Sequence, residues 1–194
     1  MEPYWSVIFE LTSFLHLLFF AIGIGAAGLL EFILPQQMIT KISDNSIALM
    51  HRGHRLISFA LLGLWISGAS LAIMRLKVEN APLSPKLIIK LFIISVLTLN
   101  MIAIGKLVVA RIEEHIDRSA LEIPPYQFGT MGGVMGLSAA CWLSALAIGS
   151  VAHFNPMDIK TLATIFLPFL LSSILIGIVA SRLLLWRGTM IRQS

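Results

Sequence analysis

The sequence predicts an all-α membrane protein, a polytopic bundle of about five transmembrane helices in a single domain. Hydrophobic residues make up 57% of the chain and charged residues only 12%, whereas about a quarter of the residues of a soluble domain are charged. The mean hydropathy is +0.89. Long runs without a formal charge recur along the chain, and each is long enough to cross the hydrocarbon layer of a bilayer as a helix.

The first span contains the clearest of these runs, which lies between Glu10 and Glu31. Pro3 precedes it and suits a first helical turn, while Tyr4 and Trp5 are residues that favour the membrane interface. All five spans are predicted at residues 6–34, 54–76, 87–110, 130–154 and 160–186.

Proline residues mark the ends of several spans. Pro35 ends the first, Pro85 precedes the third, Pro125 precedes the fourth and Pro156 follows it. The uncharged run of the second span lies between Arg55 and Arg75. Before it, the apolar segment 36–50 surrounds a polar Ser43–Ser46 stretch that can break or cap a helix, so a short interfacial piece is expected there.

The cations of the loops predict the orientation in the membrane. Nine lysine and arginine residues fall on the side of the carboxyl terminus and five on the other. The side richer in cations is normally cytoplasmic, so the amino terminus is predicted outside and the carboxyl terminus in the cytoplasm. The formal charge of +4 is dispersed over helix ends, which suits lipid headgroups and predicts the bilayer, and no nucleic acid, as a partner.

Small residues at intervals of four predict where helices approach closely. Gly132, Gly136, Ala140 and Ser144 form one such row in the fourth span, and Ser173, Gly177 and Ser181 form another in the fifth. We therefore expect these two helices to touch. The first span has two alternative rows, Ala21 with Gly25 and Gly23 with Ala27.

His16 is the candidate functional residue of the first span. An ionisable side chain within a membrane helix suggests a functional site by default, although a neutral histidine bonded to a neighbouring helix is an equally good interpretation. Gly23 lies on nearly the same face, two turns away, and leaves a flat space in which a porphyrin would fit. These two residues are the predicted cofactor contacts, for a haem b bound through His16.

The predicted depth of each histidine in the membrane limits which residues could bind a haem together. His153 is predicted near the outer interface and His51, His54 and His115 near the inner one, so no second histidine is expected at the level of His16. A haem with one histidine ligand, or a homodimer that brings two His16 residues together across a two-fold axis, avoids this difficulty.

Other residues suggest metal chemistry or packing. Met131 and Met135 have a spacing that suits Cu(I), so His16, Met131 and Met135 are the candidate metal ligands, although methionine pairs more often fill gaps between helices. Asn100 is expected to form an interhelical hydrogen bond. No acidic or basic residue lies near the middle of a predicted span, which argues against a carboxylate proton relay.

Several short motifs resemble small bacterial membrane proteins of an uncharacterised type related to the copper-resistance D family, which is loosely similar to the b-type membrane cytochromes. These motifs are His16-Leu17-Leu18 with Gly23-Ile24-Gly25-Ala26-Ala27, Leu64-Trp65-Ile66-Ser67-Gly68, and Ser84-Pro85-Lys86-Leu87 followed by Leu97-Thr98-Leu99-Asn100. The resemblance covers about residues 11–110. It implies a helical bundle in a bacterial inner membrane with a metal or haem role.

Two functions are therefore expected. The first is a small inner-membrane protein with a redox (haem b, electron transfer) or metal-handling (copper) role at His16. The second is a non-catalytic membrane subunit or transport component without a cofactor, in which His16 joins two helices. Enzymatic activity, the substrate or electron partner, and the choice between a homodimer and a membrane-complex partner stay open.

Overall fold

A computed structural model describes residues 3–32, 41–77 and 83–193 of the chain. Five helices in this part are long and apolar enough to cross a membrane, so the chain is an all-α, multi-pass membrane protein, as predicted. These helices are α1 (Pro3–Phe32), α3 (Asp44–Lys77), α4 (Pro85–Ile104) with its continuation, α6 (Pro125–Ser150) and α7 (Ile159–Gln193).

The third span changes its winding before it ends. Helix α4 passes into a π-helical turn, η1 (Gly105–Val109), and then into α5 (Ala110–Glu113). Two single 3₁₀ turns, η2 (Ala120–Glu122) and η3 (Ala152–Phe154), lie in the connections on either side of α6.

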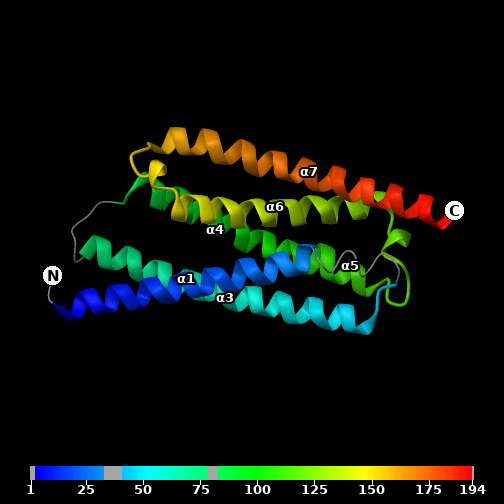
Figure 1. Cartoon of the computed structure of the whole chain (residues 1–194), viewed down its shortest axis with the longest axis horizontal. Coiled ribbons are helices and arrows are strands. Elements are labelled where there is room, and N and C mark those ends of the chain that lie inside the picture. Colours follow the sequence, from blue (N-terminus) through cyan, green and yellow to red (C-terminus); the bar gives the residue numbers. More distant parts are fainter. Residues whose placement is uncertain (1–2, 33–40, 78–82, 194) are drawn as a thin grey trace.

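The helices run side by side along the long axis of the molecule, and the chain termini lie at opposite ends (Figure 1). Helix α1 packs along α3, and α6 packs along both α7 and α4. The two groups meet where α1 touches α6 and where α3 touches η1. We call the end at which α1, α4 and α7 begin the amino-terminal end, and the opposite one the carboxyl-terminal end.

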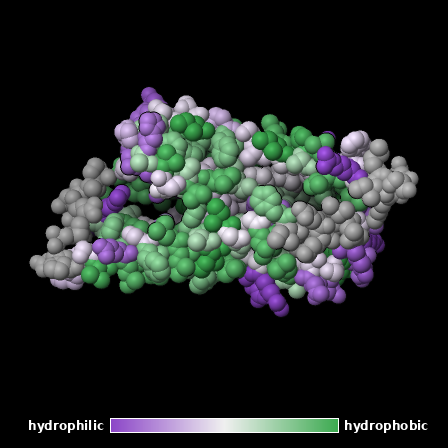
Figure 2. Space-filling model, in the orientation of Figure 1, coloured by the Kyte–Doolittle hydropathy of each residue, from purple (hydrophilic) through white to green (hydrophobic). Residues whose placement is uncertain are grey.

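Two clusters of buried apolar side chains hold the bundle together. The larger surrounds the buried Trp142 of α6 and joins it to side chains of α4 and α7 such as Ile93 and Leu170. The smaller lies at the carboxyl-terminal end around Ile42 and Ile123. Apolar side chains also cover much of the visible outer surface, and hydrophilic ones gather toward the two ends (Figure 2), as expected of a molecule whose middle faces lipid.

The segment before the second span differs from the prediction of a separate interfacial piece. Residues 44–50 are the first turns of α3 itself, which runs without a break to Lys77. The Ser43 side chain accepts a hydrogen bond from the Ser46 amide at 3.2 Å, so the polar stretch caps the helix and does not break it. Residues 36–40 of the predicted piece lie outside the described residues.

The boundaries of the last two spans are also displaced from those predicted. The fourth span starts five residues earlier, at Pro125, and ends at Ser150. The fifth continues to Gln193, beyond the last uncharged run. The two extensions arise because a helix continues through interfacial polar residues, where the backbone keeps its own hydrogen bonds. The fourth span ends earlier because the 3₁₀ turn η3 follows Ser150.

Candidate functional site

His16 joins α1 to α3 through a chain of two hydrogen bonds. Its Nδ1 lies 2.9 Å from the Ser67 Oγ, and the Ser67 hydroxyl donates its proton to the Gly63 carbonyl at 2.6 Å. A hydroxyl has one proton to give, so the Ser67 oxygen is the acceptor toward His16. The neutral ring therefore carries its proton on Nδ1, and its Nε2 has a free lone pair.

The ring of His16 fits against α3 because residue 68 is glycine. A Cβ built on Gly68 would lie 3.3 Å from His16 Cε1, which is tighter than an ordinary contact. His16 is half-buried, and none of the described residues hydrogen-bonds its Nε2. This nitrogen is thus the one atom of the site that is free to bind an iron or copper ion or to accept a proton.

The space expected beside Gly23 is filled. A Cβ on Gly23 would overlap the ring of Trp142, whose indole packs directly against the α1 backbone. Phe20 meets the same indole edge-on, with ring centroids 5.7 Å apart. A flat group in this groove would have to displace Trp142. A cofactor contact at Gly23 stays a prediction, but this structure offers no open room for it.

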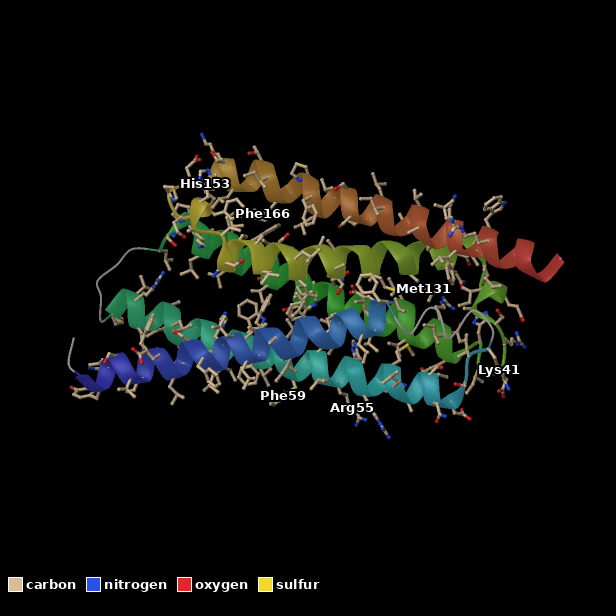
Figure 3. The ribbon with its side chains drawn as sticks, viewed as in Figure 1. Lys41, Arg55, Phe59, Met131, His153 and Phe166 are labelled. Atoms are coloured by element: carbon tan, nitrogen blue, oxygen red, sulfur yellow. The ribbon has the colours of Figure 1, made fainter. Side chains whose placement is uncertain are left out.

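Met131 and Met135 lie apart from His16. Met131 is buried in the apolar cluster at the carboxyl-terminal end, and Met135 packs against that cluster. Met50 of α3 belongs to the same cluster and precedes Ser67 by 17 residues, or about 25 Å of helix. His16 and the methionine pair therefore belong to different parts of the molecule, and the methionines fill space between helices. Met131 lies toward the carboxyl-terminal half of the bundle (Figure 3).

The histidines at the carboxyl-terminal end do not assemble a metal site. His51 Nε2 lies 2.5 Å from Glu113 Oε1, whereas the His54 ring packs against Gly105 of the π-helical turn. His115 Nδ1 bonds the Arg111 carbonyl at 2.9 Å. Within the described residues, no three His, Cys, Asp or Glu side chains gather as a metal would require.

Asn100 makes the interhelical contact that was predicted. Its Nδ2 donates to the Val134 carbonyl of α6 at 3.0 Å. The acceptor is a backbone group of a neighbouring membrane helix, so this buried amide contributes to helix association.

Two charged residues inside the bundle were missed. Glu31 was assigned to the edge of the first span, but it lies in the last turn of α1, where it is half-buried and takes Ser138 of α6 as a hydrogen-bond partner. Ser138 is in the middle of α6, so a carboxyl group does reach the centre of one span. Lys90 was counted among the cations of the outer side, at the start of the third span, and it lies in the second turn of α4, where it interacts electrostatically with His16.

The sequence did carry a signal that Glu31 and Lys90 lie inside the bundle, because each residue borders a long apolar run and neither stands within a polar loop.

Comparison of the chain with protein-family models, with curated proteins and with solved structures gives no match.

Proposed function

We propose that this chain is a small multi-pass protein of a bacterial inner membrane with a redox or metal-handling role, and that His16 is the ligand of its haem b or copper. The amino terminus would be outside and the carboxyl terminus in the cytoplasm. The observation that carries the proposal is the hydrogen-bond chain from His16 Nδ1 through Ser67 to the Gly63 carbonyl, because it leaves the Nε2 lone pair free.

The hydrogen bonds of His16 suit a histidine that would hold a metal through Nε2. A histidine that binds a metal usually donates its other ring N–H to a fixed acceptor, which sets the tautomer and the ring orientation. Ser67 supplies that acceptor, and Gly68 admits the ring edge. Haem would supply one-electron transfer when bound. Within one chain His16 would be the histidine that holds the haem, and in a homodimer the twin His16 would be the second such histidine.

An absorption spectrum of the purified protein tests this function. Cells supplied with ample haem should yield a protein with a haem band, and His16→Ala should remove it. The matched controls His51→Ala, His54→Ala and His115→Ala should leave the band unchanged. Ser67→Ala should keep the band but shift the reduction potential, because Nδ1–H loses its acceptor. A colourless wild-type protein that is also free of copper would contradict the proposal.

The second candidate function is a non-catalytic membrane subunit or transport component without a cofactor. Trp142 favours it, because its indole occupies the groove that a porphyrin would use. In that case the His16–Ser67 bond acts only in helix association. Such bonds contribute about 0.6 to 2 kcal/mol in measured membrane proteins.

A double-mutant cycle separates the two candidates. Without a cofactor, His16→Ala and Ser67→Ala should show a coupling in the free energy of unfolding of about 0.6 to 2 kcal/mol, because each removes one partner of the bond. His16→Gln keeps a donor and should retain most of the stability, and no variant should change the spectrum. A loss of a bound haem or copper in His16→Gln would contradict the second candidate.

A further inference from the structure

Three cations gather at the amino-terminal end between α3 and α4. Lys86 and Lys90 are four residues apart and therefore share one face of α4. Arg75 of α3 follows Gly68 by seven residues, which places it on the face of α3 against which the His16 ring packs. The positive charges of Lys86 and Arg75 both act electrostatically on Lys90.

The register of the two helices orders these cations by height. Trp65 Nε1 donates to Thr98 Oγ1 at 3.0 Å and so marks a common level of α3 and α4. Counting helical rise from there, Lys90 lies about 12 Å, Arg75 about 15 Å and Lys86 about 18 Å toward the amino-terminal end. His16, beside Ser67, lies only about 3 to 5 Å from that level. The cations thus form a rising row above His16.

The space between the two helix groups is open at this end. Figure 2 shows a hollow there, between the α1–α3 pair and the layer of α4, α6 and α7. The backbones of α3 and α4 do not pack against each other as those of α1 and α3 do. An ion or headgroup could therefore enter between them.

The cations have no carboxylate partner within the described residues. All described ion pairs lie at the opposite end and join Lys41 with Asp117, His51 with Glu113, and Arg111 with Glu114.

At the amino-terminal end itself, the described carboxylates Asp158 and Glu10 do not pair with these cations, one because it bonds its own helix and the other because it lies on a different face of α1. Asp158 accepts a hydrogen bond from the Thr161 amide, and Glu10 lies about 120° around α1 from His16. Lys86 donates to the neutral Asn155 Oδ1 at 2.6 Å, which holds its ammonium in place without cancelling its charge.

We propose that this row of cations is a binding site for a phosphate group, with Lys90 and Arg75 as its direct contacts and Lys86 at its rim. Lys86 and Lys90 are half-buried and Arg75 is exposed. Neighbouring cations repel one another and are stabilised by an anion that bridges them, and the arginine guanidinium matches the oxygens of a phosphate. The phosphate belongs either to the headgroup of an anionic lipid or to a soluble molecule that enters from this end. The site does not depend on a cofactor at His16.

Ligand-induced stabilisation of the full-length protein in a neutral detergent tests the site. One arm adds phosphatidylglycerol, with phosphatidylcholine as its control. The other adds sodium phosphate, with sodium chloride at equal ionic strength as its control. The readout is the midpoint of thermal unfolding, which rises when a ligand binds the folded state only.

Wild type should be stabilised in at least one arm. Lys90→Gln and Arg75→Gln should each lower the affinity for the stabilising ligand by about tenfold, which is the loss expected when one charge-assisted bond is removed. Lys160→Gln is the matched control, because Lys160 is an exposed cation at the same end on α7, and it should respond as wild type does.

The pattern of responses identifies the source of the phosphate. Stabilisation by phosphatidylglycerol alone supports a lipid headgroup, by sodium phosphate alone a soluble ligand, and by both a general phosphate site. No stabilisation in either arm overturns the proposal. An equal loss in Lys160→Gln and in the two cluster variants also overturns it, because the effect would then reflect general surface charge.

Discussion

Single side chains decide the chemistry available in this bundle. Ser67 gives its only proton to its own helix, and this local bond fixes the tautomer of a histidine on another helix. His16 Nε2 is left free because the Ser67 hydroxyl donates to the Gly63 carbonyl, four residues earlier on the same helix. This bond between a serine and the preceding turn is common in membrane helices. The proton position on His16 is thus set by Ser67, a residue of a different helix.

Asp158 provides a pH-dependent contribution to stability at the start of α7. Its carboxylate accepts a hydrogen bond from the Thr161 amide at 3.2 Å, and hydrogen bonds with Thr161 lower its pKa below the ordinary value of 3.8. Because the pKa of Asp158 is lower in the folded state than in the unfolded state, its hydrogen bond contributes its full stabilisation above the unfolded-state pKa. This stabilisation is lost as the pH falls through the folded-state pKa.

We therefore expect the free energy of unfolding to decline below about pH 4 more steeply in wild type than in Asp158→Asn. Asparagine caps a helix without titrating at this pH. Unfolding measured by fluorescence at pH 6, 4 and 3 checks the prediction, and parallel declines of the two proteins would contradict it.

Whole helices show a division into packed and lipid-facing sides. On α1, Gly23 and Ala27 are buried while Ala21 and Gly25 are exposed, so only one of the two small-residue rows makes a contact. On α6 and α7 the predicted contact is confirmed, because a Cβ on Gly132, Gly136 or Gly177 would overlap the facing backbone.

The two rows of α1 allow a matched pair of substitutions. Gly23→Ala should destabilise the protein by about 1 to 3 kcal/mol, since the added methyl group meets the Trp142 ring inside a packed core. Gly25→Ala meets nothing within 4 Å and should stay within about 1 kcal/mol of wild type. Thermal unfolding in detergent measures both, and an equal loss would show that α1 packs in another rotation.

The α6–α7 contact predicts a second difference. Gly136→Leu should be more damaging than Leu143→Ala, because the leucine side chain must separate two backbones in contact, at a cost of about 3 kcal/mol or more. Leu143 is 51% exposed, so its truncation should cost about 0.5 kcal/mol. Comparable stabilities of the two variants would place this face of α6 toward lipid.

The described part of the chain has five candidate spans, an odd number, and the chain termini lie at opposite ends of the molecule (Figure 1). Nine of the fourteen lysine and arginine residues lie toward the end of the carboxyl terminus. With the positive-inside rule, reporter fusions after Ser194 should be active in the cytoplasm, and fusions at the amino terminus should be active outside. A periplasmic signal from the carboxyl-terminal fusion would reverse the assigned orientation.

Composition and small-residue spacing alone determined the membrane class, the number of helices and the α6–α7 contact. Burial of apolar runs in lipid and close backbone approach are local properties of a helix, which the sequence records directly. Only the tertiary structure decided how the sites are composed. It filled the groove beside Gly23 with Trp142, placed Glu31 against Ser138, and brought Arg75 and Lys90 together above His16. Each of these contacts depends on the rotation and register of one helix against another. Packing between residues that are far apart in the chain sets that rotation and register.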